Sequence, residues 1–238
     1  MTSRKSMLRR DLLRRLLWAF RLGLIAVGIM AIFWGYRTYE AVSARDLRLS
    51  SFLPHGRREA PRARVGLVAG HWQSDSGAVC PDGLREVEIN LNVAYRTANV
   101  LHGMGYEVDV WPEFGQGLNN YQAAALVSIH ADSCLDRSGF KVAHAAQSAI
   151  PAVEGELVRY LTQAYAAHTS LEEDPRTITV DMTSYHAFYK IAAQTPAAII
   201  ELGYMGGDRR LLLNDPGRAA RGVAAGIAAF LESTTLEY

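Results

Sequence analysis

Apolar positions from residue 64 onward recur with two different periods. Short apolar runs that end at Gly, Pro or a polar residue are typical of buried strands, whereas apolar residues three or four positions apart are typical of helices. Arg64–Ala69 is a run of the first kind, and residues 88–104 show the second pattern. By the same criteria, the predicted strands are 64–69, 106–111, 124–129, 140–144 and 197–202, and the predicted helices are 88–104, 151–168 and 216–232.

Strands that alternate with helices predict an α/β domain whose sheet is mainly parallel and lies between helical layers. We therefore expect a three-layer α/β fold, with a mainly parallel mixed sheet flanked by helices, over residues 64–235. The composition agrees with a globular domain, because 49% of the 238 residues are apolar and 21% are charged. The net charge of +1 argues against the basic footprint of a nucleic-acid-binding protein.

The first 63 residues follow a different pattern. Residues 1–15 contain six basic residues and one acidic residue, and an apolar stretch at 16–36 is interrupted only by Arg21. A basic flank stays in the cytoplasm, and an arginine near that end can extend to the lipid headgroups. We therefore expect a basic cytoplasmic segment at 1–15, a single-pass anchor in the cytoplasmic membrane at 16–36 and a linker at 37–63. The domain that follows would then lie outside the cytoplasm.

Two other interpretations of this apolar stretch stay open. Val42, Ser43 and Ala44 have the small-residue pattern of a cleavage site, so the stretch would also serve as a signal peptide, with the protein secreted after cleavage near Ala44. It would alternatively be a core helix of a soluble domain, although no nearby segment supplies a partner face. Both the anchor and the cleaved signal imply export.

Several chemically active side chains lie at the ends of predicted strands, where open α/β sheets place their sites. His71 and His130 follow the first and third strands, and Glu86 lies at the head of the first helix. Two histidines and one carboxylate form a common ligand set for catalytic zinc, which leaves a position for water. Glu201, a carboxylate in an apolar strand, is the candidate general base.

Spacing alone leaves a structural role for these residues open, because no compact H-E-x-x-H motif is present. Four segments add to the pattern: 68–78, which holds VAGH and DSGA; 83–91, GLREVEINL; 127–132, VSIHAD; and 196–204, PAAIIELGY. In this order, and over about residues 64–232, they resemble the zinc-dependent N-acetylmuramoyl-L-alanine amidases, the type 3 amidases among the cell-wall hydrolases.

The resemblance implies that His71, Glu86 and His130 bind one zinc ion and that Glu201 is the general base. The implied reaction is hydrolysis of the amide bond between N-acetylmuramic acid and the L-alanine of the stem peptide in peptidoglycan. Glu88 is the competing ligand, and Glu86 is preferred because its distance to Asn90 is that of the family. The alternatives are a catalytically silent peptidoglycan-binding protein on the same fold and a zinc exopeptidase. An activator protein cannot be inferred from the sequence.

The chain departs from the family pattern at two places. Trp72 and Gln73 follow the first histidine, where the family usually has glycines, and Trp72 would reshape the cleft or stack on a sugar. The segment between Trp111 and Leu126 is shorter than usual and lacks the arginine that commonly follows the second strand. Both departures leave the metal ligands in place and affect the expected glycan and stem-peptide preference.

Cys80 and Cys134 each follow a proposed histidine ligand by a few residues. In an exported protein this arrangement suggests a disulfide between two active-site loops, with zinc ligation or two separate thiols as the alternatives. Asp132 would either orient a histidine ligand or be an exposed loop residue. His186 would be a structural or surface residue, or would line the substrate cleft.

Overall fold

The computed structural model describes residue 30 and residues 63–235. The chain divides into two compact units, Met1–Ala60 and Pro61–Tyr238. The expected cytoplasmic segment at 1–15, the anchor or signal segment at 16–36 and the linker at 37–63 lie outside the described residues, apart from Met30 and Ala63. Among the residues that are described, no helix is both long and apolar enough to cross a membrane.

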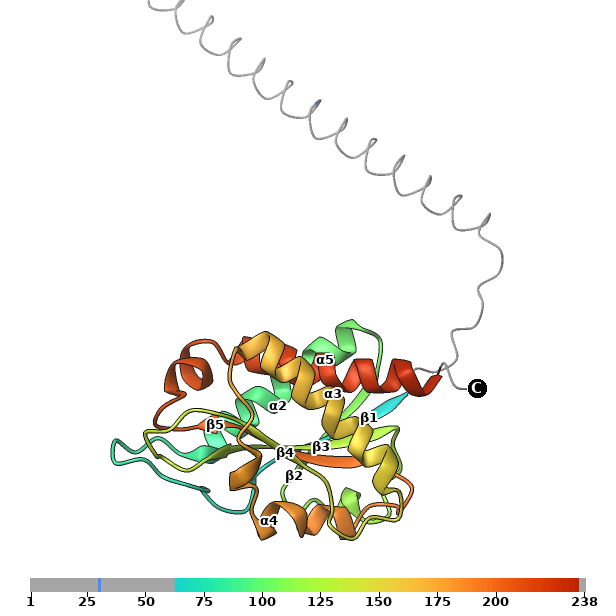
Figure 1. Cartoon of the computed structure of the whole chain (residues 1–238). Coiled ribbons are helices and arrows are strands. Elements are labelled where there is room, and N and C mark those ends of the chain that lie inside the picture. Colours follow the sequence, from blue (N-terminus) through green and yellow to red (C-terminus); the bar gives the residue numbers. More distant parts are fainter. Residues whose placement is uncertain (1–29, 31–62, 236–238) are drawn as a thin grey trace, which may run out of the picture. The chain divides into compact units, whose positions relative to one another are not determined.

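A mixed five-stranded sheet forms the centre of the second unit, with the strand order β2-β1-β3-β5-β4 (Figure 1). Four strands are parallel, and the short edge strand β4 runs antiparallel to β5. The central strands are nearly continuous apolar runs, as expected for strands buried on both faces. The strands are β1 (Arg64–Ala69), β2 (Glu107–Pro112), β3 (Ala125–Asp132), β4 (Lys141–Ala143) and β5 (Ala197–Tyr204).

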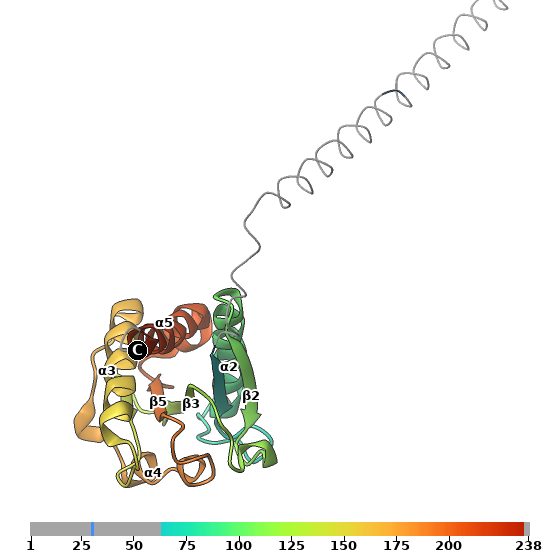
Figure 2. The same cartoon turned by 90° about the vertical axis from the view of Figure 1, so that its right-hand side faces the viewer.

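Three long helices cover one face of this sheet (Figures 1 and 2). They are α2 (Glu86–Gly103), α3 (Pro151–Thr169) and α5 (Pro216–Thr235), and α5 packs against both of the others. Their apolar faces and the sheet enclose the larger core, which includes Leu67, Val127 and Tyr165. Burial of this apolar surface is the main contribution to the stability of the domain.

Short elements cover the opposite face of the sheet. They are η1 (Gln116–Leu118), α4 (Val180–Thr183) and η3 (His186–Tyr189), and they pack on a smaller core that contains Leu126 and Ile199. A single helical turn is too short to show apolar periodicity, which is why the sequence pattern did not predict these elements. The α/β fold with a mixed sheet flanked by helices is confirmed, and its two outer layers are unequal. The remaining elements are η2 (Pro175–Thr177) and η4 (Arg210–Asn214).

The strands that carry site residues are longer than predicted. β3 and β5 continue to Asp132 and Tyr204, beyond the predicted ends at 129 and 202. His130 therefore lies within β3 and not after it, and Glu201 lies in the middle of β5 and not near its end. Because side chains alternate along a strand, both residues point to the face that carries the short elements, together with Leu126 and Ile199.

Candidate functional site

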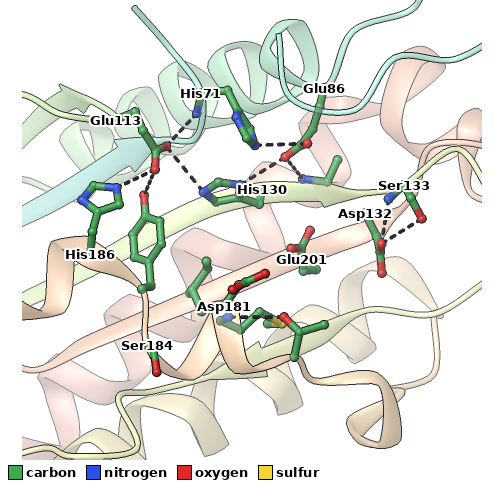
Figure 3. A pocket seen from close by; sticks show the side chains of 15 residues that line it. His71, Glu86, Glu113, His130, Asp132, Ser133, Asp181, Ser184, His186 and Glu201 are labelled. Atoms are coloured by element: carbon green, nitrogen blue, oxygen red, sulfur yellow. Dashed lines mark hydrogen bonds and ion pairs between the residues drawn. The ribbon is translucent and has the colours of Figure 1, made fainter. Parts of the chain in front are cut away.

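A cavity of about 430 Å³ opens between the sheet and the short elements, at the carboxyl ends of the central strands (Figure 3). His130 and Glu201 reach it from β3 and β5, and His71 reaches it from the turn after β1. Glu86 comes from the first turn of α2, as the helix dipole favours for a carboxylate. The structure thus brings together all four residues that the sequence analysis proposed as ligands and base.

His71, Glu86 and His130 offer ligand atoms that lie within 4.8 Å of one another. Nε2 of His71 is 3.2 Å from Oε2 of Glu86, and Nδ1 of His130 is 3.1 Å from Oε1. Donors bound at 2.0–2.1 Å to a tetrahedral zinc ion lie roughly 3.4 Å apart, so these spacings suit a shared cation. Within residues 63–235 this is the one group of three or more such residues.

The turn after β1 holds His71 in an unusual backbone conformation. His71 has φ of 65°, in the left-handed region, and its ring Nδ1 lies 2.6 Å from Oδ1 of Asp75. Contact with Asp75 turns the other ring nitrogen, Nε2, towards Glu86. The preceding residue is Gly70, where an added Cβ would be 2.3 Å from Cε1 of His130. Only glycine therefore leaves space for the second histidine at this point.

Glu86 is buried, and several donors satisfy its carboxylate. Oε2 accepts a hydrogen bond from the Ala78 amide at 3.0 Å, and Oε1 accepts one from the Asn90 side chain at 3.0 Å. Burial disfavours the charged form, but the hydrogen bonds with His130 and His71 outweigh it and hold the pKa of Glu86 well below its usual range. The same contact with Glu86 raises the pKa of His71 to about 9, against the opposing effect of burial.

Glu88, the competing ligand, is exposed on α2 and forms an ion pair with Arg85. Its side chain therefore lies away from the histidines, whereas Glu86 lies between them. The preference for Glu86 agrees with this geometry.

Glu201 lies beside His130, because the two residues are register partners on the parallel strands β3 and β5. Its Oε2 is buried and has no hydrogen-bond partner among the described residues. Burial raises the pKa of Glu201 to about 7, with His130 opposing the shift and Glu86 and Asp132 adding to it. A carboxyl group with a pKa near neutrality is suited to accept and return a proton.

Asp132 has neither of the roles that the sequence analysis considered. Its carboxylate pairs with the buried ammonium group of Lys141, 2.5 Å away, and does not orient a histidine ligand. The reason is the extension of β3 to Asp132, which brings the residue into the sheet near the antiparallel edge strand. Lys141 also donates to the Thr177 carbonyl oxygen at 3.2 Å.

Two residues that the sequence analysis did not propose also line the cavity, Glu113 and Tyr185. Glu113 directly follows β2 and is buried, and His186, a possible cleft residue, contacts it at 2.6 Å. A carboxylate just after a strand is the same signal that pointed to His130. Glu113 lies two residues beyond the predicted strand end at 111, and it belongs to none of the four family motifs.

Trp72 and the cysteines lie around the cavity without contributing to its lining. Trp72 makes an edge-to-face contact with Tyr95 of α2, with ring centroids 6.0 Å apart. Cys80 and Cys134 form a disulfide with their Cα atoms 5.3 Å apart, which joins the loop before α2 to the loop after β3. Both sulfur atoms are therefore engaged with each other, and neither is a metal ligand in this structure.

Comparison with known sequences gives this arrangement a family context. A family model described as N-acetylmuramoyl-L-alanine amidase matches residues 65–229. The N-acetylmuramoyl-L-alanine amidase AmiC of Neisseria meningitidis serogroup B is 33% identical over 107 residues, which are 41% of this chain and 26% of AmiC. The match thus spans about a quarter of the length of that curated relative.

Solved structures of N-acetylmuramoyl-L-alanine amidases share the fold. Ami1 from Mycobacterium smegmatis has a TM-score of 0.59 at 20% identity, covering 71% of this chain and 97% of that one. An N-acetylmuramoyl-L-alanine amidase from Clostridium difficile 630 has a TM-score of 0.58 at 18% identity, covering 73% and 99%. The CwlD amidase from Clostridioides difficile, in complex with the GerS lipoprotein, has a TM-score of 0.56 at 19% identity, covering 72% and 100%.

Proposed function

Because the chain belongs to the N-acetylmuramoyl-L-alanine amidase family, we propose that it hydrolyses the amide bond between N-acetylmuramic acid and the L-alanine of the stem peptide in peptidoglycan. The observation that supports this most directly is the convergence of His71, Glu86 and His130 next to Glu201. This arrangement combines a ligand set with a separate base in one cavity, which is what metal-assisted amide hydrolysis requires.

The three converging residues would hold one zinc ion. Imidazole nitrogens and a carboxylate oxygen are common zinc ligands, and the spacing of their atoms fits one shared cation. When bound, zinc supplies a Lewis acid that lowers the pKa of water and polarises the amide carbonyl. The peptide amides of Ala78 and Ala131 and the Asn90 side chain keep Glu86 oriented for this role.

Glu201 would carry the proton through the reaction. Its carboxylate accepts a proton from the attacking water, whose oxygen forms a bond to the lactyl carbonyl carbon of the muramic acid. It then donates the proton to the alanine nitrogen as the carbon–nitrogen bond breaks. The products are a carboxylate on the sugar and a free amine on the stem peptide. The register pairing of Glu201 with His130 supports this role, because the base would then lie next to the proposed ligands.

The test is a paired measurement on the full-length chain purified in detergent. We expect about one zinc ion per chain by elemental analysis, and release of free stem peptides from purified peptidoglycan by mass spectrometry. Glu201→Gln should keep the zinc and lose peptide release by at least about 100-fold, the contribution usual for a general base. Glu88→Gln, an exposed change two residues from Glu86, should behave as the parent.

The two measurements separate the alternatives. A folded chain that binds no zinc would contradict the mechanism and favour a peptidoglycan-binding protein. Zinc without peptide release in the parent would point to a required activator or to another amide substrate, such as that of an exopeptidase. Release by Glu201→Gln at the parental rate would remove Glu201 from the mechanism.

The domain would act outside the cytoplasm, attached to the membrane by residues 16–36. Support comes from the basic flank at 1–15 and from the Cys80–Cys134 disulfide, since disulfides persist in oxidising compartments. Protease added to intact spheroplasts should degrade the domain, and N-terminal sequencing of the cellular protein distinguishes the anchor from cleavage near Ala44. Protection from the protease until the membrane is broken would contradict this location.

A further inference from the structure

Glu113 is a buried carboxylate that lies next to both proposed histidine ligands. Its side chain is 7% exposed and receives partners on both carboxylate oxygens. Oε2 accepts a hydrogen bond from the His71 amide at 2.7 Å and lies 3.7 Å from Nε2 of His130. Oε1 accepts from the Tyr185 hydroxyl at 2.9 Å and lies 2.6 Å from Nε2 of His186 (Figure 3). One buried carboxylate thus contacts both histidine-bearing segments and the opposite wall of the cavity.

We propose that Glu113 is a positioning residue that fixes the two histidine ligands, His71 and His130, relative to each other and to the wall formed by Tyr185 and His186. The inference rests on the proposed metal site. It concerns a residue outside the four motifs that carry the family resemblance, at the place after β2 where the usual arginine is missing.

The backbone of His71 depends on Glu113. A non-glycine residue with φ of 65° needs support from its surroundings, because this conformation is disfavoured for side chains with a Cβ. The hydrogen bond from the His71 amide to Glu113 supplies that support, and the Glu113 amide in turn donates to the Trp72 carbonyl oxygen at 3.1 Å. Two hydrogen bonds therefore join the turn that carries His71 to Glu113, the residue that follows β2.

The ring of His130 also faces Glu113. Its Nδ1 faces Glu86, so a cation held there leaves the ring proton on Nε2, on the side of Glu113. Nε2 is buried and has no hydrogen-bond partner within the described part of the chain, and Oε2 of Glu113 faces it. A carboxylate behind a histidine ligand orients the ring and strengthens it as a ligand.

The wall of the cavity contacts the same carboxylate through Tyr185 and His186. The Ser128 hydroxyl donates to the Tyr185 hydroxyl oxygen at 3.0 Å, so Tyr185 links β3 to Glu113. His186 stacks on Phe114, with ring centroids 4.3 Å apart. The segment that follows α4 is thereby attached to the metal side of the cavity through the Glu113 carboxylate.

The experiment measures metal binding directly, with Glu113→Gln and Glu113→Ala in the full-length chain. We expect zinc affinity, measured by competition with a chelator, to fall by about 10–100-fold in Glu113→Ala. The visible absorption bands of the cobalt-substituted protein should shift in both variants, because the ligand geometry changes. Glu107→Gln, which changes an exposed carboxylate at the start of β2, is the matched control and should leave both readouts unchanged.

The zinc affinities and cobalt spectra of the two variants support or overturn the role proposed for Glu113. Wild-type zinc affinity and an unchanged cobalt spectrum in both variants would overturn it, even if activity fell. If Glu113→Ala does not fold, Glu113→Gln, which keeps the size and one acceptor oxygen, gives the answer alone. A parent chain that binds no zinc contradicts the proposed function itself, so the two failures are distinguishable.

Discussion

Glu86 and Glu201 are two carboxylates in one cavity whose surroundings shift their pKa values in opposite directions. Hydrogen bonds with His130 and His71 outweigh burial at Glu86 and hold its pKa well below its usual range. Glu201 has a buried oxygen with no hydrogen-bond partner among the described residues, and burial raises its pKa to about 7. Carboxylates separated in this way divide the roles of charged ligand and proton carrier.

The titration of Glu201 tests this division. In the metal-free protein, the ¹³C carboxyl signal that disappears in Glu201→Gln should titrate with a midpoint near 7, because burial disfavours the charged form. Zinc should lower the midpoint, since a nearby cation favours the carboxylate. The folded pKa lies above the unfolded value, so this group stabilises the metal-free fold at pH below 4.5 and loses that contribution as the pH rises through 7.

The expected effect on catalysis has a defined sign. A base must be deprotonated, so kcat/KM should fall as the pH decreases through the Glu201 midpoint in the zinc-loaded protein. A midpoint near 4.5 in the metal-free protein, the ordinary value for a glutamate, would contradict the assigned environment.

The two histidines and the proposed base were accessible from the sequence because each lies in or just after an apolar run, and Glu86 was accessible because it begins a helical pattern. Glu113 follows the same rule, but its role depends on contacts with residues that are 42 and 73 positions away. The pairing of Asp132 with Lys141 depends on β3 continuing past His130 and on an antiparallel edge strand. Apolar periodicity contains no information on either feature.

At the scale of elements, the register of the strands brings residues from separate motifs together in one site. β3 and β5 pair so that His130 and Glu201 are neighbours, and the register shifts between His130 and Asp132. The apolar runs predicted the strands and long helices because long periodic segments give the strongest signal. They could not predict α4 or η3, each a single turn that owes its conformation to contacts with the sheet.

Gly70, in the turn after β1, packs closely against His130 of β3. A Cβ at this position would be 2.3 Å from the His130 ring, so Gly70→Ala should displace that ring and lower zinc affinity. The strain should reduce the free energy of unfolding by about 1–3 kcal/mol. Chelator competition and urea denaturation measure the two effects.

Gly103→Ala is the matched control, because an added Cβ at the end of α2 meets none of the described residues within 4 Å. We expect it to be neutral or to stabilise the protein by up to about 1 kcal/mol, the helix-propensity difference between glycine and alanine. Equal zinc affinity in Gly70→Ala and Gly103→Ala would contradict the prediction, because it would show that the His130 ring can accommodate a Cβ at position 70.

At the scale of the whole domain, the Cys80–Cys134 disulfide joins two loops that flank the proposed ligands. It closes a segment of 54 residues, and a loop of this size stabilises a folded protein by about 3–4 kcal/mol through the entropy of the unfolded chain. Cys80→Ala/Cys134→Ala should therefore unfold at a lower urea concentration. Dithiothreitol should lower the midpoint of the parent towards that of the double variant and leave the double variant unchanged. Identical midpoints for all samples would contradict a stabilising role.

The cavity lies on the face of the sheet with the short elements, whereas the long helices and the larger core lie on the other face. Substitutions at residues 178–184, which precede the contact of Tyr185 with Glu113, thus leave the larger core intact. Loops on a rigid scaffold tolerate change better than the scaffold does. Such a domain can therefore change these short elements while the proposed ligands and the contacts of Glu113 stay the same, so substrate preference can change without a new fold.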